Sequence, residues 1–134
     1  MSNAIVQVGP SEKTDSGRVI VHAALGGTLG PEDIQLLKSW GEGLNATVKK
    51  FADEQKSPVA VLIDISSFEM YTNPDVITLL WHLMKEDNAY IYRTATFGGT
   101  VVHEMIEQVI RSLAGRTNLK NFKSEAEART WLTQ

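Results

Sequence analysis

The stretch that decides the fold reads Val59-Ala60-Val61-Leu62-Ile63-Asp64-Ile65-Ser66-Ser67. It begins with an uninterrupted apolar run, which is typical of a central strand covered on both faces of its sheet. It ends on one acid and two hydroxyl side chains. In an open α/β sheet, ligand and partner sites lie just beyond the carboxyl ends of such strands. We therefore expect a functional site within residues 64–75.

The residues before this strand predict an antiparallel hairpin followed by a long helix. Two strand candidates, residues 5–8 and 18–25, are separated by a polar segment rich in turn-forming residues. The glycine-rich residues 26–30 end the second strand. Pro31 then suits a first helical position, where its missing N–H is not needed. Apolar residues recur at helical spacings from there to Phe51, which predicts one buried helix face.

The residues after the central strand predict further strand–helix units. Asn73-Pro74-Asp75 combines a capping residue, a first-turn proline and an acid, so a helix over residues 76–84 should follow. A β-branched and aromatic strand over residues 91–97 precedes an amphipathic helix over residues 101–113. After a short extended piece, Ser124 and Glu127 form a capping box for a last helix.

This alternation predicts one α/β domain over residues 1–134. We expect a single-layer, mostly parallel sheet of four to five strands, with an N-terminal antiparallel hairpin, about four helices and right-handed crossovers. The composition, 43% hydrophobic and 22% charged, is that of a globular protein. The element order therefore defines the fold class without any repeat or linker.

Composition also excludes several classes of function. The net charge of −3 lacks the basic excess that nucleic-acid binding needs, so we expect no nucleic-acid partner. The chain has no cysteine, which rules out disulfides and thiolate metal ligands. No apolar run approaches the ~20 residues needed to span a bilayer, and the first residues lack the pattern of a signal peptide. We expect a cytoplasmic protein with no membrane span.

Two stretches resemble a known family. The hairpin, the long helix and the strand ending Asp64-Ile65-Ser66 resemble a STAS domain, the fold of sulfate-transporter C-terminal domains and anti-sigma-factor antagonists. Residues 122–132 resemble the ending Phe-x-Ser-x-x-x-Ala-x-x-Trp-Leu of STAS-like proteins grouped with the lipid-binding SEC14 type. The resemblance implies a STAS-like fold over nearly the whole chain.

The resemblance also shows where this chain departs from the family. In antagonist-type STAS domains, a kinase partner phosphorylates a serine or threonine in the loop after the central strand. The corresponding position here is Asn73, and the hydroxyl nearest the helix start is Thr72. The phospho-loop is therefore not preserved.

The candidate binding residues follow the central strand, and each has a structural alternative. Asp64 could hold a cation or amine, or it could cap the turn through the N–H groups of the following serines. Ser66 and Thr72 could accept a phosphate, although Thr72 and Asn73 also suit a plain helix start. The apolar side chains could form a pocket or partner surface, or fold back onto the core. The full candidate set is Asp64, Ser66, Phe68, Met70, Tyr71, Thr72 and Asn73.

Two further patterns are weaker. Gly98-Gly99-Thr100 joins a strand to a helix start, where backbone N–H groups could hold an anion, although glycines are usual in such turns. His103 begins a sequence that lacks the second histidine of a zinc helix. We therefore expect no metal and no cofactor.

Three hypotheses of function remain open. The first is a non-enzymatic STAS-like regulatory domain that binds a protein partner, or a second copy of itself as a homodimer, through the loop after the central strand. The second is a SEC14-like binder of a small apolar or anionic ligand, held between the central strands and the helices that begin near Asn73 and Thr100. The third is an enzyme, which no catalytic constellation in the sequence supports.

Overall fold

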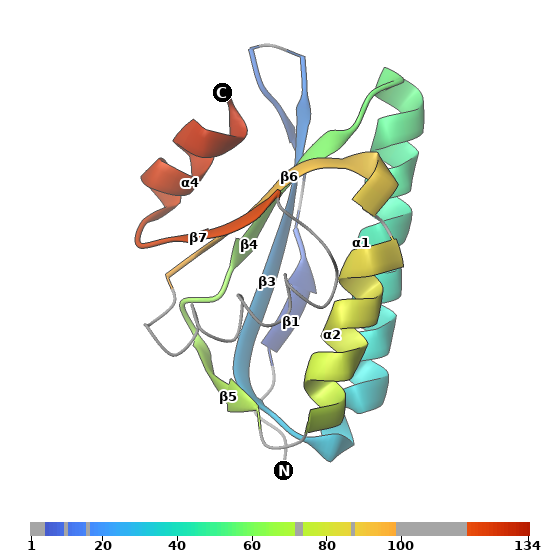
Figure 1. Cartoon of the computed structure of the whole chain (residues 1–134), viewed down its shortest axis with the longest axis vertical. Coiled ribbons are helices and arrows are strands. Elements are labelled where there is room, and N and C mark those ends of the chain that lie inside the picture. The colour runs from blue at the N-terminus through green and yellow to red at the C-terminus, as the bar shows by residue number, and fades with distance from the viewer. Residues whose placement is uncertain (1–4, 10, 16, 72–73, 87, 99–117) are drawn as a thin grey trace.

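A computed structural model describes residues 5–9, 11–15, 17–71, 74–86, 88–98 and 118–134. They form a seven-stranded mixed sheet whose main strand order is β1-β3-β4-β6-β7, while β2 and β5 both pair with β3 (Figure 1). The strands are β1 (Ile5–Val8), β2 (Glu12–Lys13), β3 (Val19–Leu29), β4 (Val59–Asp64), β5 (Phe68–Tyr71), β6 (Ile91–Phe97) and β7 (Leu119–Phe122).

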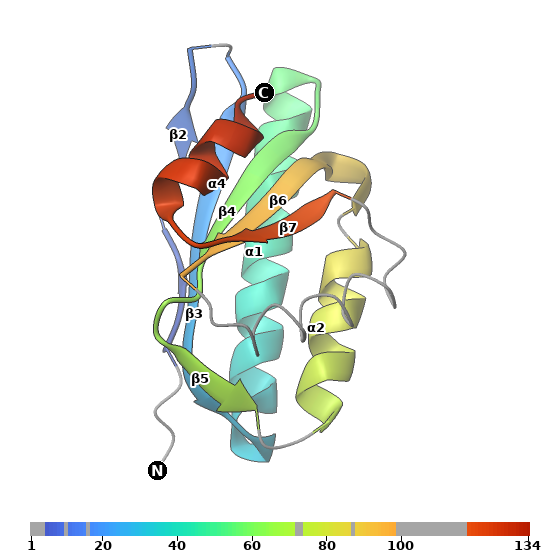
Figure 2. The ribbon, with the colours of Figure 1, turned by 60° about the vertical axis from the view of Figure 1, so that its left-hand side comes forward.

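Helices cover both faces of the sheet. The described helices are the 3₁₀ turns η1 (Pro31–Asp33) and η2 (Asn88–Tyr90) and the α-helices α1 (Ile34–Gln55), α2 (Pro74–Glu86) and α4 (Glu125–Leu132). The two longer helices, α1 and α2, lie side by side on one face, and α4 covers the other (Figures 1 and 2). The molecule is therefore built in three layers.

The central strand divides the core between the two faces. Val59 and Val61 of β4 pack in the cluster beneath α1. Ala60 and Leu62, whose side chains alternate with them, pack in the cluster beneath α4. All four are at most 1% exposed, so the prediction of a strand buried on both faces is confirmed.

The strand directions also agree with the sequence. β1 and β3 pair antiparallel, from Ile5 opposite Gly26 to Val8 opposite Ala23, which confirms the N-terminal hairpin. The pairs β3–β4, β4–β6 and β6–β7 are all parallel. The α/β class and the mostly parallel sheet are therefore confirmed.

Two expectations about the strands are wrong. β3 does not stop at residue 25 but runs to Leu29 through two glycines. Residues 68–71, expected as loop, form β5, which pairs in parallel with the end of β3. The reason is tertiary: the Gly27 amide donates to the Ser67 carbonyl at 2.8 Å, so the glycine-rich segment gains a partner that local propensity does not include.

The helix starts are close to those expected. Pro31 opens the 3₁₀ turn η1, and the α-helix begins three residues later at Ile34. The buried Asp33 carboxylate accepts a hydrogen bond from the Gly30 amide at 2.8 Å. At α4, the Ser124 hydroxyl accepts the Glu127 amide, as a capping residue does. The helix expected over residues 101–113 lies outside the described residues.

Candidate functional site

The central strand ends in a closed turn. Asp64 Oδ1 accepts hydrogen bonds from the Ser66 amide at 2.8 Å and from the Ser66 hydroxyl at 2.5 Å. The Phe68 amide donates to the Ile65 carbonyl at 3.0 Å and completes the turn. Asp64 is half-buried, whereas Ser66 and Ser67 are exposed. Asp64 therefore caps the turn through Ser66, which was the structural alternative for this residue.

Two glycines, one in β3 and one just after β6, leave space for this turn. A Cβ on Gly26 of β3 would lie 2.8 Å from the Ser67 Cβ. A Cβ on Gly98, just after β6, would lie 2.6 Å from the Ser66 Cβ and 2.9 Å from its Cα. The backbone of the turn is also tied to β6, because the Ile65 amide donates to the Phe97 carbonyl at 3.1 Å. The turn is therefore wedged at the carboxyl edge of the sheet.

At the glycine turn expected to bind an anion, one backbone N–H is already used in a hydrogen bond within the sheet. Gly98 has a φ of +87°, a conformation that glycine adopts readily. Its amide donates to the Phe122 carbonyl at 3.3 Å, so that N–H is already used within the sheet. Gly99 and Thr100 lie outside the described residues.

The remaining candidate residues do not behave as one loop. Phe68 is half-buried and packs against the cluster that contains Leu29, Leu37 and Val76, so it contributes to the core. Met70 and Tyr71 lie in β5, opposite Thr28 and Leu29 of β3. Thr72 and Asn73 lie outside the described residues. The structure thus brings Asp64 and Ser66 into direct contact and places Phe68 on the core side.

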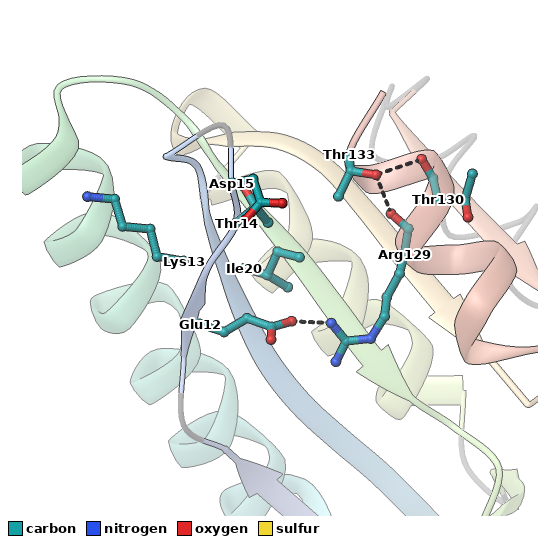
Figure 3. A pocket seen from close by; sticks show the side chains of 8 residues that line it. All are labelled: Glu12, Lys13, Thr14, Asp15, Ile20, Arg129, Thr130 and Thr133. Carbon is teal, nitrogen blue, oxygen red and sulfur yellow. Dashed lines mark hydrogen bonds and ion pairs between the residues drawn. The ribbon is translucent and has the colours of Figure 1, made fainter.

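A pocket of about 540 Å³ lies elsewhere, between the hairpin that joins β2 to β3 and helix α4 (Figure 3). Most of its lining residues are polar or charged by type; they are Glu12, Lys13, Thr14, Asp15, Ile20, Arg129, Thr130 and Thr133. Sequence reasoning missed this site because its residues come from opposite ends of the chain. The capping box located the start of α4 but not the surface on which it packs.

Arg129 links two acidic side chains at this pocket. Arg129 donates through Nε to Glu125 at 2.7 Å and through Nη1 to Glu12. Glu12 Oε1 also lies 3.1 Å from His22 Nε2. The hydrogen bond from Arg129 lowers the pKa of the Glu12 carboxyl, and the hydrogen bond to Glu125 raises the pKa of Arg129. These four side chains form a surface chain that joins β2, β3 and α4.

The described residues include no metal-binding cluster and no helix that could span a membrane. In this part of the chain, no group of three or more histidine, aspartate or glutamate side chains is placed to hold a metal ion. None of the helices described here is long and apolar enough to cross a membrane.

Comparison with known proteins rests on structure. No protein-family model matches the chain, and no curated protein matches its sequence. An uncharacterised DUF3478-family protein with a SpoIIAA-like fold, from Shewanella loihica PV-4, superposes with a TM-score of 0.68 at 19% identity, covering 98% of this chain and 97% of that one. The anti-sigma factor antagonist SpoIIAA in its unphosphorylated form superposes with a TM-score of 0.61 at 14% identity, with 96% of each chain covered.

Proposed function

We propose that the protein is a non-enzymatic regulatory domain that binds a protein partner or a second copy of itself. The proposal starts from its SpoIIAA-like fold, which is the fold of STAS domains. The contact surface is the carboxyl-edge surface, defined as the turn at residues 64–67 together with β5. One structural neighbour is an anti-sigma factor antagonist, and the fold of the other is likewise SpoIIAA-like. These likenesses support a binding role in general terms.

The observation that carries the proposal is the state of Asp64. Its Oδ1 is engaged by both the amide and the hydroxyl of Ser66, so this oxygen stabilises the turn. The same bonds and the two neighbouring glycines hold the exposed serines in one arrangement. A pre-organised surface loses little entropy on binding, which favours docking.

The proposed binding does not depend on phosphorylation at the family's position. By the resemblance, that position is Asn73, whose carboxamide cannot accept a phosphoryl group as a hydroxyl does. We therefore propose that the occupancy of the carboxyl-edge surface is set by partner concentration and not by a kinase acting at this residue. Ser66 is also a poor target, because its hydroxyl is bonded to Asp64 and Gly98 packs closely against it.

The small-ligand alternative is tested by the same protein preparation. The pocket described above lies between α4 and the β2–β3 hairpin, so it is not the site between the central strands and α2 that this alternative expects. Native mass spectrometry of the purified chain distinguishes the hypotheses. A co-purifying small molecule would favour the SEC14-like alternative, and a bare mass would favour the protein-binding proposal.

The direct test compares two charge reversals. Glu69 is exposed on β5, and Glu54 is exposed near the end of α1, away from the proposed surface. We expect Glu69→Lys to weaken partner binding or self-association at least tenfold. The new positive charge would face groups that are complementary to the original negative charge. Glu54→Lys, with the same change in net charge, should leave binding intact.

Both measurements use the full chain. Sedimentation velocity reports self-association, and affinity enrichment with cross-linking reports a partner and its contact residues. The proposal is wrong if the protein stays monomeric and enriches no partner specifically, or if both variants reduce binding equally.

A further inference from the structure

A group of cationic side chains lies at the amino edge of the sheet, where β3 and β6 begin. Arg18, just before β3, stacks over the ring of Tyr92 in β6, with its guanidinium carbon 4.0 Å from the ring centroid. Arg93 approaches the same ring at 4.8 Å and the ring of Trp131 in α4 at 4.9 Å. All four side chains are half-buried and therefore remain accessible to solvent. In Figure 1 the start of β6 and the end of α4 lie at the upper end of the molecule, whereas β5 lies at the lower end.

Three of these side chains, those of Arg18, Arg93 and Tyr92, each donate a hydrogen bond to a backbone carbonyl. Arg18 Nη1 donates to the Pro58 carbonyl at 2.6 Å, and Arg93 Nη1 donates to the Trp131 carbonyl at 2.6 Å. The Tyr92 hydroxyl donates to the Gln134 carbonyl at 2.7 Å. A guanidinium carries five N–H donors, so both arginines keep donors beyond the bond that positions them.

The charges of Arg18 and Arg93 are not neutralised within the described part of the chain. The ion pairs found there join Arg129 to Glu12 and to Glu125, and Glu12 also contacts His22. Arg18 and Arg93 take part in none of them. Since both guanidinium carbons lie within 4.8 Å of one ring centroid, they are less than about 10 Å apart, a distance at which like charges repel. An anion bound beside both guanidinium groups would offset this repulsion.

We propose that Arg18, Tyr92 and Arg93 form a binding site for a single oxyanion group, a carboxylate or a phosphate. The planar fork of a guanidinium matches the two oxygens of either group and binds them through paired hydrogen bonds. The Tyr92 ring contacts both arginines, and these cation–π contacts support the guanidinium groups without cancelling their charge. This site is separate from the carboxyl-edge surface and does not depend on the function proposed for it.

The structure also supplies an internal control for the proposal. Arg129 is a third half-buried arginine, but Glu12 and Glu125 already occupy its guanidinium. Replacing Arg129 with Gln changes the net charge as much as replacing Arg18 or Arg93 does. A general electrostatic effect would follow all three substitutions equally, whereas a site would follow only two of them.

The experiment titrates the full chain with inorganic phosphate and, separately, with acetate, at constant ionic strength balanced by sodium chloride. Binding is followed through the ¹⁵N–¹H signals of the arginine Nε–H groups. We expect saturable shifts of the Arg18 and Arg93 signals at millimolar anion. Arg18→Gln and Arg93→Gln should each weaken the affinity at least about fivefold, and Arg129→Gln should leave it within about twofold of the parent.

A conservative variant keeps the test decisive if a glutamine variant fails to fold. Arg93→Lys retains the charge but loses the planar fork, so it should weaken binding while circular dichroism stays unchanged. Saturation by phosphate alone would identify a phosphate site, and saturation by both anions would identify a site that also takes a carboxylate side chain. Shifts that never saturate, or an equal loss of binding in Arg129→Gln, would overturn the proposal.

Discussion

Two glycines share a backbone conformation but differ in their surroundings. Gly17 and Gly98 both have a φ of +87°. A Cβ on Gly17 would meet only the Lys13 Cε at 3.9 Å, whereas one on Gly98 would lie 2.9 Å from the backbone Cα of Ser66. The first position therefore needs glycine for its conformation alone. The second needs glycine also because the turn after β4 occupies the space of a side chain.

This pair predicts a measurable difference in stability. Gly17→Ala should lower the free energy of unfolding by about 1–2 kcal/mol, the usual cost of a left-handed conformation in a residue with a Cβ. Gly98→Ala should lower it by about 3 kcal/mol or more, because a clash with the backbone adds overpacking to that cost. Urea denaturation at neutral pH measures both changes. Equal losses in the two variants would show that the close approach to Ser66 has no energetic weight.

The same residues show how far sequence reasoning reaches at this scale. That Asp64 caps its own turn could be weighed from the sequence, because the groups involved are two positions apart. The approach of Gly26 and Gly98 to that turn could not. It depends on the register of β3 and β6 against β4, which long-range pairing decides. Arg18 and Tyr92 meet for the same long-range reason.

At the scale of elements, helix α1 contains two glycines with opposite roles. A Cβ on Gly41 would lie 2.2 Å from the Leu83 Cδ1 of α2, so this glycine allows the two helices to pack closely. A Cβ on Gly43, two residues later, would meet nothing within 4 Å.

Alanine substitutions at Gly41 and Gly43 should therefore change the stability of the protein in opposite directions. Gly41→Ala should destabilise the protein by about 1–3 kcal/mol through overpacking against Leu83. Gly43→Ala should stabilise it by about 0.5–1 kcal/mol, because alanine favours the exposed interior of a helix. Thermal and urea unfolding of the two variants, compared with the parent, measure the difference. A stabilising Gly41→Ala would mean that Leu83 moves aside at little cost.

The stability contributed by the contact between β2 and α4 depends on pH. The Arg129 hydrogen bond lowers the pKa of Glu12 below its unfolded value of about 4.5. A lowered carboxyl pKa stabilises the fold above the unfolded value, and this contribution is lost as the pH falls through the folded pKa. Because Glu12 is 43% exposed, solvent screens the pair, and its contribution should not exceed about 1 kcal/mol.

Comparison of Glu12→Gln with the parent tests this junction. The parent should be more stable at pH 7, and the difference should shrink once the pH falls below about 4.5 and disappear in strong acid. It should also shrink in 1 M salt. Urea denaturation across pH 3–7 measures both trends. A difference that does not vary with pH would show that Glu12 acts through packing and not through its charge.

At this scale the sequence predicted the regular elements better than the irregular ones. The apolar run of β4 and the β-branched run of β6 identified both strands, and the residues around Pro31 and Ser124 marked two helix starts. β5 and the end of β3 were missed, because each is stabilised by the other across a gap in the sequence. Local patterns contain no information on such a pairing.

Across the whole molecule, the protection of backbone amides from hydrogen exchange should fall from the centre of the sheet to its margins. β4 lies between β3 and β6 with both faces covered, while β2 has two residues and β5 pairs, within the described residues, with β3 alone. We expect the amides of β4 to exchange with solvent only on global unfolding. Those of β2 and β5 should exchange through local opening.

Native-state hydrogen exchange by NMR checks this order. The free energy of opening for β4 amides should equal the global value from denaturation, and that of β2 and β5 should be lower by several kcal/mol. A uniform free energy of opening across all strands would contradict this order.

The long strand β3 has a consequence for synthesis of the chain. Its 11 residues contact β1 and β2 on one edge and β4 and β5 on the other. The first edge is covered by residues already made, but β4 and β5 follow only after the 22 residues of α1. At about 5–20 residues per second, the ribosome leaves the second, apolar edge of β3 unpaired for seconds. Nascent chains are then open to pairing with one another, so variants that slow the arrival of β4 should be lost to aggregation during translation even where the finished protein is stable.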